Sequence, residues 1–529
     1  MIRWLGLSQA EPSDEPGLLL IQIDGLACEQ FERAVQRGRM PFVGKLIKKD
    51  GYRLHPMYSG LPSTTPAVQA ELFYGVRCAV PAFSFRDPES DQVVRMVDNE
   101  PAAAMEAKME SQEDGLLASG SAYTNIYSGG AAEPHFCAAT MGWNGMFDKA
   151  TRLKWVGIVL LNWMSVLRTF LLMFVELGVG LYDAVLGHLS GQNLLTELKL
   201  IPSRIAIGVG LRELATIGAS MDVTRGLKVV QLNFLAYDEQ AHRRGPSSRF
   251  AHWSLKGIDR AIRRLYKASQ SSDRRNYQVW IYSDHGQERV TPYEKRFGRT
   301  IHEAVDEAFG KSAGEQAKAN RKAEISNAGA RRQWIRGRKK TTRGQPLARE
   351  SDDDAMSKPA VEVIAIGPIG HVYATEEIDS DELDCVAERL VESAGIPAVL
   401  RLTSDQRVTA WTSEGRFALP DDIAKVVGSD HPFLSELADD LECLCRHEAA
   451  GRLILCGWMP NGENISFVEE NGAHGGPGTA ETDAFVLVPA ATRLTTPARG
   501  FLRPEDFRDA ALAEMEARRD TPVARLAPA

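Results

Sequence analysis

The sequence predicts an α/β fold with a mostly parallel central sheet and helices on both faces. Short apolar runs with the length of buried strands recur along the chain, and amphipathic helical patterns lie between them. Strands that alternate with helices are typical of such sheets. The expected strands are 18–23, 227–234, 278–283, 361–366, 398–402, 453–456 and 485–488. The clearest helical patterns are 31–49, 253–270 and 382–393.

The composition is that of a globular protein with a large core. The chain has 529 residues, of which 44% are hydrophobic and 25% are charged. We therefore expect a single catalytic domain over 15–529, with inserts inside it. A formal net charge of -8 argues against nucleic acid as the main partner. The sequence leaves the oligomeric state open.

Cysteine usage and the N-terminus predict a cytoplasmic protein. The seven cysteines form no zinc-finger spacing, and their odd number fits a reducing compartment. The segment 1–17 contains three acidic side chains and no apolar core of signal-peptide length, so we expect no secretory signal.

An apolar helical insert is expected at 145–222. Within it, 155–182 is very apolar and is interrupted only by Arg168 and Glu176. Its longest uncharged run, 155–167, is shorter than the roughly 20 residues that a spanning helix needs. The segment is therefore either a pair of buried helices or an element that lies in a membrane interface, which would make the protein peripherally membrane-associated.

A charged insert is expected at 311–359. It has few apolar residues, a basic run at 331–340 and an acidic run at 351–354. Such a composition predicts a flexible linker whose charges are solvated. Contact of the basic run with anionic lipid headgroups is the alternative, and it would agree with a membrane role for 155–182.

Acidic and histidine side chains follow several of the strand-like runs. Asp284 and His285, for example, come directly after the run 278–283. Ligands bind beyond the carboxyl ends of parallel strands, so we expect such residues to converge at one edge of the sheet. The full set is Asp24, Asp238, His242, Asp284, His285 and His474.

These residue types predict a metal centre. Carboxylate and imidazole ligands suit zinc and similar divalent ions, and three carboxylates with three imidazoles suffice for two ions that share one site. Two ions about 3.5–4 Å apart can stabilise both the attacking and the leaving oxygen of an in-line phosphoryl displacement.

Thr65 is the candidate nucleophile for such a displacement. Proline favours the first helical position, so Pro66 predicts Thr65 as the N-cap of a helix over 66–74. The free N–H groups of a helix N-terminus attract an anionic phosphoryl group. A neighbouring cation would activate the threonine hydroxyl, which is otherwise a weak nucleophile.

Each motif by itself also has a plain structural explanation. Thr65 alone fits an ordinary helix cap, Asp24 before a glycine fits a turn, and His474 among glycines fits a loop. Asp238 and His242, four residues apart, could form a pair on a helix surface. The joint occurrence of the motifs and their order along the chain favour the catalytic interpretation.

In this order the motifs resemble those of the alkaline phosphatase superfamily, in its nucleotide pyrophosphatase/phosphodiesterase branch, over 18–295 and 361–490. The matching motifs are Asp24-Gly25, Thr65 in Pro-Ser-Thr-Thr-Pro, the D-x-x-x-H-x-x-G element that starts at Asp238, Asp284-His285-Gly286 and His474-Gly475. The resemblance implies two divalent ions, with zinc favoured and manganese as the alternative. The ligands that it implies are Asp24, Thr65, Asp284 and His285 for one ion, and Asp238, His242 and His474 for the other.

The segment 117–131 resembles bacterial members of the superfamily. The resemblance implies an asparagine near the transferred phosphoryl group, and Asn125 is the candidate. A capped turn is the plain structural alternative for this segment.

Two departures from the family pattern narrow the expected chemistry. Pro-Ala-Val-Gln at 66–69 stands where the family often has an aromatic residue and an asparagine, which weakens the case for a nucleotide substrate. The sulfatase pattern C-x-P-x-R is absent. The resemblance therefore implies a two-metal phosphoric ester hydrolase, most simply a phosphodiesterase with a covalent phosphothreonine intermediate.

Two alternatives to a phosphodiesterase stay open. A phosphotransferase or a phosphonate hydrolase could use the same site on a lipid-linked substrate, which the apolar segment 155–182 would suit. A non-catalytic, membrane-associated protein on a decayed hydrolase scaffold is the alternative from another class.

Overall fold

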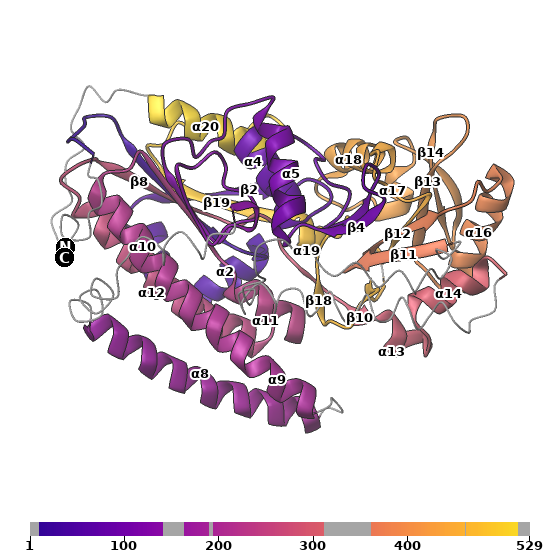
Figure 1. Ribbon diagram of the computed structural model, residues 1–529, viewed down its shortest axis with the longest axis horizontal. Coiled ribbons are helices and arrows are strands. Elements are labelled where there is room, and N and C mark those ends of the chain that lie inside the picture. The colour runs from indigo at the N-terminus through magenta and orange to yellow at the C-terminus, as the bar shows by residue number, and fades with distance from the viewer. Residues whose placement is uncertain (1–9, 141–162, 190–193, 311–360, 461, 517–529) are drawn as a thin grey trace, which may run out of the picture. The chain divides into compact units, whose positions relative to one another are not determined.

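The computed structural model describes residues 10–140, 163–189, 194–310, 361–460 and 462–516 (Figure 1). The chain divides into two compact units. Unit 1 comprises Met1–Ala79, Asn99–Arg289 and Asn471–Ala529, and unit 2 comprises Val80–Asp98 and Val290–Glu470. The expectation of a single catalytic domain over 15–529 concerns how the units work together, and it stays a prediction.

Unit 1 is built on a seven-stranded sheet with the strand order β2-β19-β8-β1-β7-β5-β6. From β8 to β6 the neighbouring strands pair in parallel, whereas β19 runs antiparallel to both β8 and β2. Strands β1, β7 and β8 are buried along their whole length, as expected where helices cover both faces. The predicted mostly parallel α/β sheet is therefore confirmed. The strands are β1 Gly17–Ile23, β2 Tyr52–Tyr58, β5 Ser121–Tyr123, β6 Glu133–His135, β7 Val229–Phe234, β8 Tyr277–Tyr282 and β19 Asp483–Pro489.

Helices lie on both faces of this sheet (Figure 1). Helices α10 and α12 lie on one face, and α4, α5 and α20 lie on the other. Phe507 of α20 packs edge-on against Trp280 of β8, with ring centroids 5.2 Å apart. The bounds are α4 Thr65–Tyr74, α5 Asn99–Glu110, α10 Arg212–Arg225, α11 Ala236–Arg244, α12 Arg249–Gln270, α19 Thr479–Thr482 and α20 Pro504–Glu516. A short pair of strands, β9 Glu288–Arg289 and β18 Gly472–Ala473, completes unit 1.

The single helix expected over 31–49 is wrong, because two helices occupy this segment. Helix α2 is Cys28–Gln36 and α3 is Pro41–Lys49. A proline fixes its own φ and disfavours helical geometry in the residue before it, so Pro41 starts a new helix instead of continuing the old one. The helices expected over 253–270 and 382–393 are confirmed.

Unit 2 holds a separate six-stranded antiparallel sheet in the order β11-β12-β16-β13-β14-β15. The expected strands 361–366, 398–402 and 453–456 exist, but they belong to this sheet and not to the parallel one. Only two residues join β11 to β12, and so short a connection can link only antiparallel strands. The strands are β11 Val361–Ile366, β12 Ile369–Ala374, β13 Ala398–Leu402, β14 Val408–Thr412, β15 Gly415–Leu419 and β16 Leu453–Cys456.

Helices of unit 2 bury apolar side chains against this sheet, and shorter strands surround it. The helices are α13 Tyr293–Phe297, α14 Ile301–Ala308, α16 Ser380–Glu392, α17 Ile423–Val427 and α18 Leu434–Arg446. The short strands are β3 Ser84–Asp87, β4 Gln92–Arg95, β10 Thr291–Pro292 and β17 Ile465–Ser466.

Unit 1 also contains a pair of long helices, α8 and α9. Helix α8 is Trp163–Leu189, α9 is Leu194–Ile205, and the π-helical segment η2, Ala206–Leu211, leads from α9 into α10. In the described part of the chain, Leu167–Leu189 is the one helical stretch long and apolar enough to cross a membrane by length and composition. Residues 145–162 and 190–193 of the expected apolar insert, and the whole expected charged insert 311–359, lie outside the described residues.

Candidate metal centre and active site

The ends of β1 and β8 bring Asp24, Asp284 and His285 together. The two strands pair in parallel with Gln22 opposite Tyr282, so the residues that follow them emerge side by side. His285 Nε2 lies 3.4 Å from Asp284 Oδ2 and 3.7 Å from Asp24 Oδ1. These three residues form the first cluster, and all three are buried.

Thr65 adjoins the first cluster at the start of α4. Its Oγ1 lies 3.4 Å from Asp24 Oδ1 and 3.3 Å from His285 Nε2. The predicted capping role is wrong by one residue, because α4 starts at Thr65 and its N-cap is Thr64. As the first helical residue, Thr65 does not use its hydroxyl to cap the helix. The hydroxyl is turned toward the carboxylate and the imidazole instead.

Asp238, His242 and His474 form the second cluster. Asp238 and His242 lie one turn apart on α11, whereas His474 follows β18. Asp238 Oδ1 lies 3.3 Å from His242 Nε2 and 3.6 Å from His474 Nε2. The ligand atoms of each cluster lie within 4.8 Å of one another.

All three histidines bind a backbone carbonyl through Nδ1. The Nδ1 atoms of His285, His242 and His474 lie 2.9 Å from the carbonyl oxygens of Gly286, Gly472 and Ser63, respectively. A carbonyl only accepts, so each neutral ring must carry its proton on Nδ1. The Nε2 lone pairs are therefore left for another partner, and this is the usual arrangement of a histidine that binds a metal.

The two clusters lie against each other. The rings of His285 and His474 stack with centroids 3.9 Å apart and an interplanar angle of 22°. Gly25 lets the backbone of the first cluster approach the second closely: its φ is 68°, and a Cβ there would lie 2.6 Å from Asp238 Oδ1. Six ligand candidates and Thr65 thus surround one small volume of unit 1.

The buried charge of this volume fits divalent cations. Asp24 and Asp284 are 4% and 0% exposed, and within the described residues neither forms an ion pair with a lysine or arginine. Burial and the nearby carboxylates of Asp284 and Asp238 hold the pKa of Asp24 well above its ordinary value. Burial raises the pKa of Asp284 to about 7. A bound cation would reverse both effects, and the oxygen and nitrogen donor set suits zinc and related ions.

Asn125 lies in a network of buried amides. Its Nδ2 donates to Gln231 Oε1 at 2.5 Å, and its Oδ1 accepts from Gln69 Nε2 at 3.2 Å. Gln69 follows Thr65 by one turn of α4. Within the described residues no hydrogen bond joins Asn125 to Thr65 or to either cluster. Asn125 therefore braces the helix that carries Thr65, and a direct contact with substrate stays a prediction.

Sequence reasoning missed several residues that hold the ligands in position. Asn233 donates to Asp24 Oδ2 at 3.0 Å, and Gln287 donates to Asp238 Oδ1 at 2.5 Å. Glu481 accepts from the backbone N–H groups of Gly476 and Gly478 and so fixes the loop after His474. The sequence signal that could have identified these residues is a polar side chain inside or just after an otherwise apolar strand, such as Asn233 in β7.

Comparisons with known proteins found one family model and several similar solved structures. A model of the family "Type I phosphodiesterase / nucleotide pyrophosphatase" matches residues 18–381. Phosphonoacetate hydrolase from Sinorhizobium meliloti, solved with phosphonoacetate, is 12% identical with a TM-score of 0.48, over 96% of this chain and 97% of that chain. Murine ectonucleotide pyrophosphatase / phosphodiesterase 5, in an inactive form with AMP, is 10% identical with a TM-score of 0.48, over 95% of each chain. No curated protein matches the sequence.

The family match covers more than half of the chain and includes Asp24, Thr65, Asp238, Asp284 and their neighbours. The chain belongs to the type I phosphodiesterase / nucleotide pyrophosphatase family of the alkaline phosphatase superfamily, whose members are hydrolases that act on phosphoric esters.

Proposed function

We propose that the chain is a phosphodiesterase that uses Thr65 as its nucleophile and binds two divalent ions, preferably zinc, with manganese as the alternative. The observation that carries the proposal is the environment of the Thr65 hydroxyl. It lies at the start of α4, within 3.4 Å of Asp24 and His285, and these residues belong to a buried cluster suited to a cation. The proposed ligands are Asp24, Thr65, Asp284 and His285 for one ion, and Asp238, His242 and His474 for the other.

Cations bound in the two clusters would supply positive charge that lowers the pKa of the Thr65 hydroxyl and neutralises the phosphoryl oxygens. The chain itself orients the nucleophile. The hydroxyl donates to Asp24 Oδ1, and the other oxygen of Asp24 accepts from Asn233, so the carboxylate is held from both sides. This pre-organisation lowers the entropic cost of bringing Thr65 Oγ1 in line with the phosphorus atom.

The proposed reaction has two displacements. Thr65 Oγ1 forms a bond to phosphorus while the bond from phosphorus to the leaving oxygen breaks, and the leaving group departs as an alcohol after gaining a proton. Water then attacks the phosphothreonine, which releases a phosphomonoester and restores the hydroxyl. The N–H groups at the N-terminus of α4 favour the anionic phosphoryl group in both steps.

Thr64 adds a donor beside this N-terminus. Its hydroxyl is buried and has no hydrogen-bond partner within the described residues. A buried hydroxyl without a partner costs free energy, and a phosphoryl oxygen in the active site would satisfy it. We therefore propose that Thr64 binds substrate while Thr65 reacts with it.

A pair of valine substitutions tests the assignment. Thr65→Val keeps the shape of the side chain and removes the nucleophile, so hydrolysis of bis(p-nitrophenyl) phosphate should fall by about 1,000-fold or more. Metal content should stay nearly unchanged, because Asp24, Asp284 and His285 still hold the ion. Thr64→Val is the matched control and should lower the rate by about 10–100-fold, because only a hydrogen bond is lost. Full activity of Thr65→Val would contradict the proposal.

Activity measured on several substrates and with several metals tests which class of ester the protein hydrolyses. The phosphodiester should be hydrolysed faster than p-nitrophenyl phosphate or a phosphonate, and a chelator should abolish the activity. Zinc or manganese should restore it, with close to two ions bound per chain. A preference for the monoester or the phosphonate would replace the diesterase proposal, and activity in the metal-free protein would overturn it.

A further inference from the structure

Helix α8 presents a long apolar face to solvent. Phe174 of α8 is 70% exposed, Leu189 is 76% exposed, and Leu195 at the start of α9 is 68% exposed. Soluble proteins rarely leave so many large apolar side chains uncovered on one element. We call this surface the apolar face; it consists of Leu167, Phe170, Leu171, Phe174, Leu177, Leu181, Tyr182, Val185, Leu189 and Leu195.

The charged residues of α8 point the other way. Arg168 pairs with Glu213 of α10 at 2.5 Å, Glu176 pairs with Arg204 of α9 at 2.5 Å, and Asp183 pairs with Arg244 of α11 at 2.8 Å. The spacings of eight and seven residues put all three on one side of the helix. The charges that interrupt the helix in sequence therefore leave its outer side uncharged.

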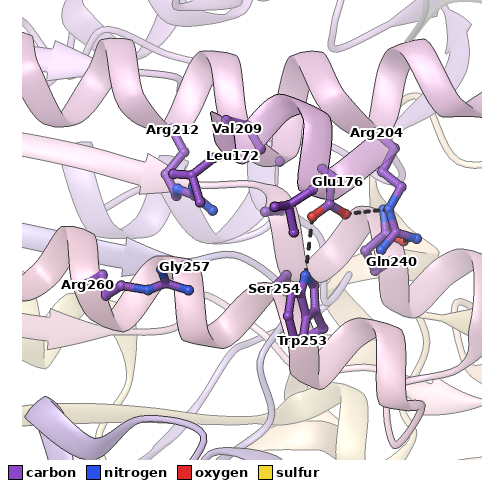
Figure 2. A pocket seen from close by; sticks show the side chains of 13 residues that line it. Leu172, Glu176, Arg204, Val209, Arg212, Gln240, Trp253, Ser254, Gly257 and Arg260 are labelled. Carbon is purple, nitrogen blue, oxygen red and sulfur yellow. Dashed lines mark hydrogen bonds and ion pairs between the residues drawn. The ribbon is translucent and has the colours of Figure 1, made fainter. Parts of the chain in front are cut away.

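A pocket with both polar and apolar lining residues opens beneath α8, between this helix, η2 and α12 (Figure 2). Leu172 and Glu176 of α8, Arg204 and Arg212, and Trp253 and Arg260 of α12 are among the residues that line it. The pocket leaves about 40 Å³ for the centres of water-sized molecules, whereas about 10–15 Å³ suffices for one water. It can hold a small polar group, such as a phosphate.

Two buried guanidinium groups line this pocket with unused donors. Arg204 and Arg212 are 2% and 8% exposed, yet Arg204 Nη2 and Arg212 Nε have no hydrogen-bond partner within the described residues. Arg212 rests against Gly257, where a Cβ would lie 2.0 Å from Nη1. Leaving a buried, charged donor without an acceptor costs free energy. The geometry therefore indicates that an anion binds near these two groups.

The charge balance around the pocket is positive. Arg168, Arg212 and Arg264 share the single carboxylate of Glu213, which leaves two positive charges in excess. Arg260 adds a third at the rim, where its Nε donates only to a backbone carbonyl. Burial lowers the pKa of Arg212; Glu213 and Glu176 offset part of this effect, and the neighbouring Arg260 acts in the same direction as burial. A bound anion would relieve both effects.

The negative charge of Glu176 is compatible with an anion in the pocket. One of its carboxylate oxygens accepts from Arg204 Nε at 2.5 Å, and the other accepts from Trp253 Nε1 at 3.2 Å (Figure 2). Each oxygen thus accepts from a donor of the protein, which weakens the repulsion between this carboxylate and an anion in the pocket.

We propose that this pocket binds the phosphate group of an anionic phospholipid while the apolar face lies in the bilayer interface. Val175 connects the two parts, because it lines the pocket and is also 50% exposed. Trp253 and Arg260 line the pocket, and the ammonium of Lys256 lies 5.2 Å from the Trp253 ring centroid. Tryptophan and basic residues are typical of the level of lipid headgroups.

The helix lies in the plane of the membrane and does not span it. Its three ion pairs tie α8 to the rest of unit 1 along about 20 Å of its length. A spanning orientation would carry these pairs and their partners on α9, α10 and α11 into the hydrocarbon, which is very unfavourable. An in-plane orientation buries the apolar face and leaves the pairs in unit 1 undisturbed.

Vesicle co-sedimentation of the full chain tests both parts. The protein should bind vesicles of phosphatidylcholine with phosphatidylglycerol several-fold better than vesicles of phosphatidylcholine alone. Phe174→Glu should weaken binding to the anionic vesicles by about tenfold or more, because a large apolar side chain is lost and a negative charge is added. Val93→Glu, at a 42% exposed valine of unit 2, is the matched control and should bind like the unchanged protein.

Arg260→Gln tests the pocket with little risk to folding, because Arg260 is exposed. It should lower binding to anionic vesicles by about fivefold and leave the weak binding to phosphatidylcholine unchanged. Lys267→Gln removes the same charge two turns further along α12 and serves as its control. Thermal melting of each variant establishes that it is folded.

Three outcomes would overturn the proposal. One is an absence of vesicle binding, even if inorganic phosphate raises the melting temperature of the protein, because the ligand would then be free phosphate. Another is equal binding to both kinds of vesicle that Arg260→Gln does not change. The third is a stable dimer that Phe174→Glu dissociates, because the apolar face would then be covered by a second copy of the chain.

Discussion

Unit 1 buries carboxylates in two regions, and it neutralises them differently. Beneath α8, each of Glu176, Asp183, Glu197 and Glu213 pairs with at least one arginine. At the ends of β1 and β8, Asp24 and Asp284 have only a histidine as an ionic partner within the described residues. The carboxylates of Asp24, Asp284, Asp183, Glu197 and Glu213 are buried, and that of Glu176 is partly exposed.

The difference indicates which sign of charge a ligand must bring to each region. A buried carboxylate costs several kcal/mol unless a positive charge compensates it. The α8 region carries its own positive charge and even has a surplus, so it is suited to an anion. The strand-end region carries a deficit, so it is suited to cations. Each of the following changes alters the charge or the ligands of one of the two regions.

The largest effect is expected at the strand ends. Asp284→Asn removes one ligand and one negative charge from the first cluster, so this cluster should lose its ion and turnover should fall by about 1,000-fold. Metal analysis should find about one ion per chain instead of two. An unchanged metal content with unchanged activity would contradict the assignment of the first cluster.

The next effect is expected beneath α8. Glu213→Gln leaves the guanidinium groups of Arg168, Arg212 and Arg264 without their shared carboxylate, so the free energy of unfolding should fall by about 3–5 kcal/mol. Urea denaturation measures this change, and Glu442→Gln on the exposed side of α18 is a control that should cost less than about 1 kcal/mol. A small loss for Glu213→Gln would show that α8 is not anchored by charge.

The metal-free protein should lose stability as pH rises. Asp284 has a pKa of about 7 in the fold, compared with an ordinary 3.8, and the pKa of Asp24 is raised as well. A raised folded-state pKa gives stability that is complete below the ordinary value and is lost as pH rises through the folded value. The loss between about pH 4 and pH 7 should be on the order of a few kcal/mol.

Thermal melting with and without a chelator measures this pH dependence. Zinc should stabilise the protein more at pH 7 than at pH 5, because protons compete with the metal for the same carboxylates. Asp284→Asn should flatten the pH profile of the metal-free protein. A profile that rises between pH 5 and pH 7 would contradict the prediction.

The smallest effect is expected from Asn233→Ala. Asn233 holds Asp24 without being a ligand candidate, so its removal should weaken metal binding by about 10–100-fold and leave the fold intact. Competition with a fluorescent chelator measures the affinity. Asn99→Ala, which removes bonds to the backbone of Ala138 and Ala139 elsewhere in unit 1, is a matched control for the loss of an amide.

The sequence predicted the parallel core and the converging ligand candidates for a common physical reason. Buried parallel strands are long apolar runs, and a polar residue directly after such a run is conspicuous. Asp24, Asp284 and His285 are of this kind. The antiparallel strands of unit 2 are also apolar runs in the sequence. An apolar run does not indicate which strand it pairs with, so only the structure could assign these strands to a second sheet.

Sequence patterns could not identify ion-pair partners that lie far apart in the chain. Nothing near Arg168 or Glu176 indicates that they pair with Glu213 and Arg204, so the apolar segment could be interpreted as buried or as interfacial. The inward orientation of these charges favours the interfacial alternative. The start of α4 was misplaced by one residue because Pro66 is compatible with either of the first two helical positions.

The order of synthesis sets when the second cluster can form. Gly472, which holds the His242 ring through its carbonyl, lies 230 residues after it in the chain, and all of Val290–Glu470 is made in between. A nascent chain that ends before Asn471 can contain Asp24, Thr65, Asp284 and His285 but not His474. Until the last segment leaves the ribosome, the chain can therefore form only part of the candidate metal site, and unfinished chains could not hydrolyse phosphodiesters by the proposed two-ion route.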